Sequence, residues 1–123
     1  MTCAANGADG QLSRFEVVLS TDTTRSWAQL RGELDLTSAP RLERLLDELC
    51  RDGYRQIILD MSGLEFLGAS ALSVFVRVDQ ALRAAGGELV LTRPSRMASR
   101  ILAITGLDAT LQTFSPDDQR VGA

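Results

Sequence analysis

Residues 57–72 read IILDMSGLEFLGASAL, and this stretch organises the rest of the chain. It opens with three large aliphatic residues, which predict a buried strand. Asp60, Ser62 and Gly63 follow, and residues of these types favour turns. A segment with helical period then begins near Ser70. Because the first turn of a helix presents unpaired N–H groups, we expect the functional surface of this chain between Ser62 and Ser70.

The composition predicts one ordinary globular domain. The chain has 123 residues, of which 45% are hydrophobic and 24% charged, with a net charge of −3. No basic stripe is present, so we expect no direct binding of nucleic acid. No apolar run predicts a membrane span or a signal peptide, and the two cysteines, Cys3 and Cys50, form no pattern. These features predict a cytoplasmic protein that does not act at a membrane.

Two absences argue against an enzyme. The chain contains no histidine and no lysine, so all 13 basic residues are arginine. This removes the commonest general base, the commonest metal ligand and the lysine of a P-loop or a receiver domain. Asp60 at a strand end suggests the phosphorylated aspartate of receiver domains, but the other receiver residues are missing. We therefore interpret Asp60 as an acceptor for the Ser62-Gly63 turn, and we expect no catalytic residue, cofactor or metal.

The order of elements predicts an α/β fold with a small mixed sheet of four to five strands and helices packed against it. The first two strands are expected to be antiparallel, and helical crossovers make the later strands parallel. A single domain is expected over residues 15–114, between tails at 1–14 and 115–123. The expected strands are 15–19, 25–30, 56–60, 88–92 and 111–114. The expected helices begin near Pro40, Ser70 and Ser95 and end at Gly53, Ala85 and Gly106.

The period of each helix predicts which side chains face the sheet. In the first helix we expect an inner stripe of Leu42, Leu45, Leu46 and Leu49. In the second we expect Ala71, Phe75, Val78, Leu82 and Ala85. In the third we expect Met97, Ile101 and Ile104.

Four motifs in register resemble those of the STAS domain family. They read RGELDLTSAPRLERLL, IILDMSGLEFLGASAL, AAGGELVLTRPS and ILAITGLDATLQTF, and the likeness runs from about Phe15 to Phe114. The resemblance is to the free-standing bacterial branch, the anti-sigma-factor antagonists. It implies that the chain binds an anti-sigma factor, often a serine kinase, and so frees a sigma factor for transcription.

The regulatory motif of that family is altered in this chain. In the family, a hydrophobic pair precedes D-S-S-G-L or D-S-T-G-L, and the first hydroxyl residue accepts phosphate from the kinase. Here Phe66-Leu67 precede Gly68, Ala69, Ser70 and Ala71. The resemblance therefore implies that Ala69 occupies the acceptor position, where no phosphate can be attached. Three versions stay open: permanent activity, Ser70 as a substitute acceptor, or another control such as the two cysteines.

The resemblance also implies a partner-binding edge made by two loops. The residues expected there are Gly32, Glu33, Asp35, Thr37 and Ser38 in the first loop, and Ser62, Gly68, Ala69 and Ser70 in the second. Thr37 or Ser38 is in addition expected to cap the first helix. The alternative function is a ligand-sensing or scaffold domain that kept the fold without the phosphorylation switch. The sequence predicts no oligomeric state.

Overall fold

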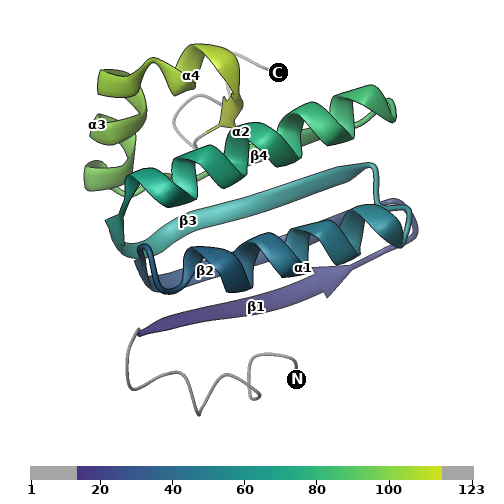
Figure 1. The fold of residues 1–123 in the computed structure, drawn as a ribbon, viewed down its shortest axis with the longest axis horizontal. Helices are drawn as coiled ribbons and strands as arrows, with labels where there is room; N and C mark the ends of the chain where they lie inside the picture. Colours follow the sequence, from purple (N-terminus) through teal and green to yellow (C-terminus); the bar gives the residue numbers. More distant parts are fainter. Residues whose placement is uncertain (1–13, 115–123) are drawn as a thin grey trace.

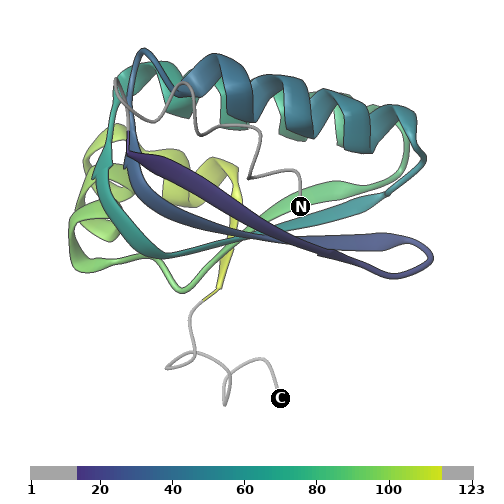
Figure 2. The ribbon, with the colours of Figure 1, turned by 90° about the horizontal axis from the view of Figure 1, so that it is seen from below.

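The computed structural model describes residues 14–114 and builds them around one five-stranded sheet (Figure 1). The strands lie side by side in chain order: β1 (Phe15–Thr21), β2 (Arg25–Leu34), β3 (Gln56–Leu67), β4 (Glu88–Thr92) and β5 (Gln112–Phe114). The helices are α1 (Ala39–Arg51), α2 (Ala69–Ala84), α3 (Arg96–Thr105) and α4 (Leu107–Thr110). Figure 2 shows the sheet edge-on, with α1 and α2 together on one face.

The pairing of the strands confirms the predicted α/β class and mixed sheet. β1 and β2 are antiparallel, while β2 with β3, β3 with β4, and β4 with β5 are parallel. Each parallel connection passes through a helix, as expected for crossovers between neighbouring strands. The short strand expected near the C-terminus is present as β5. The two expected tails lie outside the described residues, apart from Arg14.

The core lies between the sheet and the helices, and the predicted inner stripes are largely correct. Leu42, Leu46 and Leu49 of α1 are buried, and Leu45 is partly buried. Two predictions are wrong: Ala85 is exposed beyond the end of α2, and Ile104 is 76% exposed. The buried residues of α3 are instead Ala98 and Leu102, which lie four positions apart on one face of the helix.

The largest difference from the prediction is the length of β3. We expected a loop after residue 60, but the strand continues to Leu67 because Met61, Leu64 and Leu67 are buried. The turn expected at Ser62-Gly63 is instead a bulge within the strand, where three residues of β3 advance against two of β2. Asp60 is the predicted local acceptor, since its Oδ1 receives the Ser62 N–H at 2.9 Å.

The helix ends follow the expected rules in two places. The Ser95 side chain caps α3 by accepting the Ala98 N–H at 3.3 Å, and Gly106 ends the helix with φ +80°. α4 was not predicted, because four residues are too few to show a helical period. β2 also runs four residues further than expected, to Leu34.

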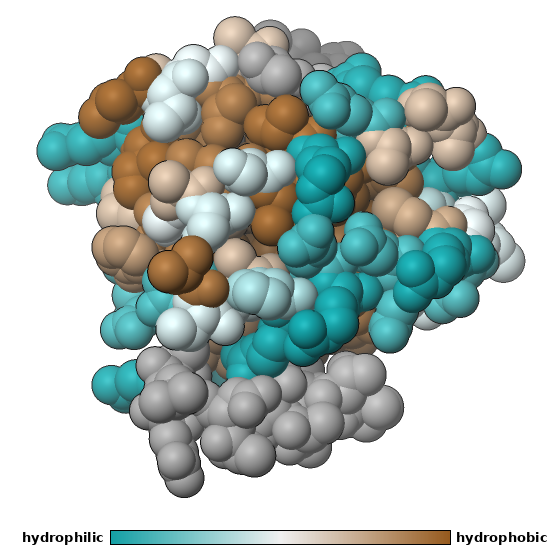
Figure 3. Space-filling model, viewed as in Figure 1, coloured by the Kyte–Doolittle hydropathy of each residue, from teal (hydrophilic) through white to brown (hydrophobic). Residues whose placement is uncertain are grey.

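Apolar side chains are unevenly distributed over the surface. In Figure 3 the hydrophobic residues gather on the side where α3 and the start of α2 lie, and hydrophilic residues dominate the opposite side. The two ends of α2 therefore lie in different surroundings.

Candidate partner-binding site

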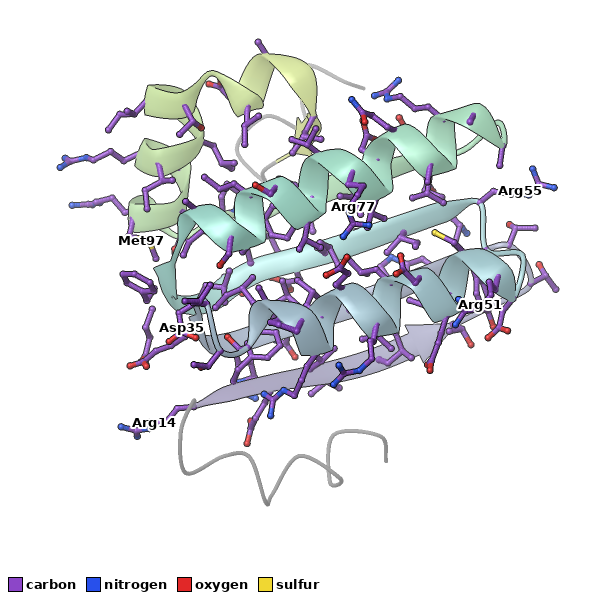
Figure 4. The ribbon with its side chains drawn as sticks, viewed as in Figure 1. Arg14, Asp35, Arg51, Arg55, Arg77 and Met97 are labelled. Carbon is purple, nitrogen blue, oxygen red and sulfur yellow. The ribbon has the colours of Figure 1, made fainter. Side chains whose placement is uncertain are left out.

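Two connections, β2–α1 and β3–α2, meet at one end of the molecule. Leu34 and Leu67 are paired in register at the ends of their strands, and the Gly68 N–H donates to the Leu34 carbonyl at 2.9 Å. Asp35 lies at this end, next to the start of α2 (Figure 4). We call this surface, made by residues 35–38 and 66–70, the helix-start end.

The first of these connections is a turn organised by Asp35. Its Oδ1 accepts the Thr37 hydroxyl at 2.8 Å, the Thr37 N–H at 3.0 Å and the Ser38 N–H at 3.2 Å. These donors, the Thr37 hydroxyl first, hold the pKa of the Asp35 carboxyl below its usual value. The loop therefore presents an ionised carboxylate whose position is fixed by its own chain.

Ser38 holds this turn from inside. It is fully buried, its hydroxyl donates to the Glu33 carbonyl at 2.9 Å, and its Oγ accepts the Asp35 N–H at 2.9 Å. It occupies the position before α1, but no side-chain bond caps the helix. Ser38 therefore occupies the predicted cap position without making the side-chain bond of a cap, and its burial gives it a supporting place rather than a partner-facing one.

Gly32 and Ser62 are also placed differently from the expectation. Gly32 has φ +94°, and an added Cβ would lie 1.7 Å from the Arg14 carbonyl oxygen, so this glycine permits the close approach of β1. Ser62 is exposed, but it lies in β3 five residues before Leu67, about 16 Å along the strand. Neither residue belongs to the helix-start end.

The second connection delivers α2 without a side-chain cap. Gly68 is the cap residue, with extended backbone angles (φ −98°, ψ 169°). Ala69, the first helical residue, is exposed, and Ser70 after it is half-buried. The N–H groups of this first turn have no partner within the helix, so the methyl group of Ala69 lies beside a region of positive potential.

Two exposed apolar side chains at this end were not in the predicted site. Leu36 is 76% exposed in the Asp35 turn, and Phe66 is 49% exposed at the end of β3. The two connections touch here, since a Cβ built on Gly68 would lie 3.3 Å from the Phe66 ring and 3.6 Å from the Asp35 Cα. The sequence feature that could have identified Leu36 is its position as a single leucine within the polar run 35–38. A side chain in such a turn has no core to enter, so an exposed leucine could have been expected there.

The helix-start end therefore combines an apolar pair with an acidic border. Glu33 is half-buried and pairs with Phe66 in register, and Glu65 is exposed beside it. Leu36 and Phe66 provide apolar area that binding can remove from water. Asp35, Glu33 and Glu65 favour a partner that carries arginine or lysine.

Comparison with known proteins assigns the family. Residues 21–118 match the STAS domain family. This chain is a member of the STAS family. The anti-sigma-B factor antagonist of Staphylococcus aureus (strain NCTC 8325 / PS 47) is 33% identical over 76 residues, which are 62% of this chain and 70% of the relative. The STAS domain described here therefore belongs among the anti-sigma-factor antagonists, as its motifs predicted.

Solved structures share the fold. An anti-sigma factor antagonist from Mycobacterium paratuberculosis superposes with a TM-score of 0.75 at 24% identity, covering 88% of this chain and 92% of that one. The unphosphorylated form of the antagonist SpoIIAA gives 0.72 at 20% identity, covering 87% and 97%. These likenesses extend over nearly all of this STAS domain.

None of the helices between residues 14 and 114 combines the length and the apolar character that crossing a membrane requires. Over the same range, no group of three acidic or cysteine side chains is placed to hold a metal ion.

Proposed function

We propose that this STAS domain binds an anti-sigma factor through the helix-start end and so frees a sigma factor for transcription in the cytoplasm. The observation that carries the proposal is the exposure of Leu36 and Phe66 beside the uncapped start of α2. Well-packed apolar side chains at the centre of an interface contribute most of its binding free energy. The acidic border adds faster association with a basic partner.

We propose further that phosphorylation does not switch this binding off. The resemblance assigns the acceptor position to Ala69, whose exposed methyl group has no oxygen to phosphorylate. A phosphate of charge about −2 at this position would repel an acidic partner group and obstruct close packing. Without it, the protein stays competent to bind when an anti-sigma factor of the serine kinase class is active.

Ser70 is a weaker acceptor than an aligned serine would be. It is the second residue of α2 and half-buried, whereas Ala69 is exposed. Redox control is also disfavoured, because burial, followed by the neighbouring Asp47 carboxylate, raises the pKa of the half-buried Cys50 thiol. A raised pKa reduces the thiolate that reacts. Cys3 lies outside the described residues.

The test rebuilds the family motif with Gly68→Asp and Ala69→Ser in one chain. The extended backbone at residue 68 is one that aspartate adopts readily, and the nearest atom to a new Cβ is the edge of the half-exposed Phe66 ring. We expect the double variant to gain one phosphate when it is incubated with the anti-sigma factor and ATP. Its affinity for the anti-sigma factor should then fall at least tenfold, while the parent protein binds equally with and without ATP.

Two controls make this result decisive. Ser70→Ala in the parent chain should change neither the mass after incubation nor the binding. If the parent chain is phosphorylated and Ser70→Ala abolishes this phosphorylation, the protein is controlled at Ser70 and is not permanently active. Absence of binding by the parent chain to any anti-sigma factor of its own genome would contradict the proposed function and favour the ligand-sensing alternative.

A further inference from the structure

The face of the sheet opposite α1 and α2 contains a cavity that the proposed function does not use. Its volume is about 500 Å³, within the range of small-molecule sites. Figure 2 shows this face below the strands, away from α1 and α2. The residues that line it are Val18, Ser20, Trp27, Ala28, Gln29, Ile58, Asp60, Val90, Thr92 and Arg93.

The strand register arranges these side chains in two rows. Ile58 lies between Trp27 and Val90, each paired with it in a neighbouring strand. Two residues further along the strands, Asp60 lies in the same way between Gln29 and Thr92. Because side chains two apart point to the same face, an apolar row lies about 7 Å from a polar row.

Asp60, at the centre of the polar row, is only loosely paired with Arg93, which follows Thr92. The Nε of Arg93 lies 3.6 Å from Oδ2 of Asp60, longer than the 2.7–2.9 Å or so of a close charge-assisted bond. The Arg93 side chain is 55% exposed and that of Asp60 26%. Both groups therefore retain capacity for a ligand at the edge of the cavity.

The backbone of Arg93 is also unusual. Its φ of +52° is the one positive value found at a non-glycine residue between positions 14 and 114. Side chains disfavour this conformation, and such residues gather at functional sites. The guanidinium group of this residue lies at the cavity beside Asp60.

We propose that this cavity binds a free α-amino acid with a large apolar side chain. Asp60 receives the ammonium group, Arg93 the carboxylate, and the side chain lies along the row formed by Trp27, Ile58 and Val90. An adjacent negative and positive group match the charges that an α-amino acid carries on neighbouring atoms. A protein occupant fits less well, because three or four apolar side chains are far fewer than the roughly 20 residues per side of a stable interface.

The chain contains a single tryptophan, and that residue lines the cavity, so its fluorescence reports occupancy. L-phenylalanine is the probe, since it absorbs and emits little where tryptophan does. Phenethylamine lacks the carboxylate and 3-phenylpropionate lacks the ammonium group. We expect L-phenylalanine to shift the emission and to bind about five- to tenfold more tightly than either analogue. Equal affinity for all three compounds, or no response up to about 10 mM L-phenylalanine, would overturn the proposal.

Variants identify the groups responsible. Arg93→Gln should equalise the affinities of L-phenylalanine and phenethylamine, and Asp60→Asn should equalise those of L-phenylalanine and 3-phenylpropionate. Arg100→Gln is the matched control, because Arg100 is exposed on α3 and outside the cavity lining. Retained discrimination in both cavity variants would also overturn the assignment.

A second variant guards against an effect of misfolding. Arg93→Gly removes the guanidinium group but suits the positive φ, so its melting temperature should not fall while its affinity does. An unchanged affinity would exclude Arg93 from the site. All these titrations use the isolated chain without an anti-sigma factor, so their failure leaves the proposed function of the helix-start end unaffected.

Discussion

The two ends of α2 differ in how completely the chain satisfies its own polar groups. At the C-terminal end, the buried Asp79 carboxylate accepts the Leu89 N–H at 3.0 Å and the Arg83 Nε–H at 2.8 Å. The Gly87 N–H closes the same end by donating to the Leu82 carbonyl at 2.7 Å. At the N-terminal end no side chain caps the helix, and large apolar side chains are exposed.

The C-terminal end of α2 therefore contributes mainly to stability, and the N-terminal end is the one available for binding. At the closed end the Asp79 side chain joins α2 to β4 through the Leu89 N–H. The helix-start end leaves N–H groups and apolar area that a partner can cover. Substitutions at the first end should therefore change the free energy of unfolding, and substitutions at the second should change affinity.

The largest expected effect is at the closed end. Asp79→Ala leaves the Leu89 N–H without its acceptor and Arg83 without its ion pair, so the free energy of unfolding should fall by about 3 kcal/mol. Urea denaturation measures this loss. Gln80→Ala, at the next and exposed position of α2, is the control and should change stability by less than about 0.5 kcal/mol. Equal losses in the two variants would show that Asp79 does not join α2 to β4.

The next effect is at the helix-start end and concerns affinity. Leu36→Ser and Phe66→Ser should each weaken binding of the anti-sigma factor at least tenfold, a loss of about 1.4 kcal/mol, because each removes apolar contact area. The free energy of unfolding should change by less than about 1 kcal/mol, since both side chains are largely exposed. Calorimetric titration measures the affinity.

Ile104→Ser is the matched control for this pair. Ile104 is as exposed as Leu36, at 76%, but it lies on α3 outside the helix-start end. We expect its replacement to leave the affinity within about twofold. A loss as large as that of Leu36→Ser would move the binding surface toward α3.

A smaller effect concerns pH at the Asp35 turn. Because the pKa of Asp35 is lowered on folding, its carboxylate stabilises the folded state above the ordinary pKa of 3.8, and this contribution is lost as the pH falls through the lower folded value. Asp35→Asn should therefore lower the free energy of unfolding by about 0.5 kcal/mol at pH 7, and this difference should shrink as the pH falls through the lowered pKa of Asp35. Thermal melting across this range measures the difference.

Thr37→Val tests the cause of that pKa shift. The Thr37 hydroxyl is the main group that lowers the pKa of Asp35, so its removal should raise the pKa observed by NMR titration. An unchanged pKa would assign the shift to the remaining donors, which are the backbone N–H groups and the Ser38 hydroxyl.

Much of the fold could be predicted from the sequence, because aliphatic runs and helical periods record burial directly. The order of strands and helices, the start of the third helix near Ser95 and its stop at Gly106 are examples. The length of β3 could not be predicted in this way. Asp60, Ser62 and Gly63 are residues typical of a turn, and the register against β2 alone reveals that they form a bulge.

The positions of site residues that belong to the family motif could be predicted from the sequence. Whether a loop side chain points inward or toward solvent could not. Gly68, Ala69 and Ser70 lie at the start of α2 as expected. Ser38, which was expected to face a partner, is buried, whereas Leu36, which the predicted site did not include, is exposed. The hydrogen bonds of Ser38 to residues 33 and 35 hold its side chain inside the turn, and they exist only once the turn is folded.

The smallest effect concerns the missing cap at Gly68. Gly68→Asp should raise the free energy of unfolding by a few tenths of a kcal/mol, because aspartate at this position can accept an N–H of the first turn of α2. Gly68→Ala is the matched control, since it restricts the backbone equally without supplying an acceptor, and the difference between the two variants isolates the cap. Calorimetric melting of both proteins measures that difference. If Gly68→Ala raises the free energy of unfolding as much as Gly68→Asp does, the missing cap does not destabilise the fold. The missing cap would then be no evidence that the start of α2 is kept open for a partner.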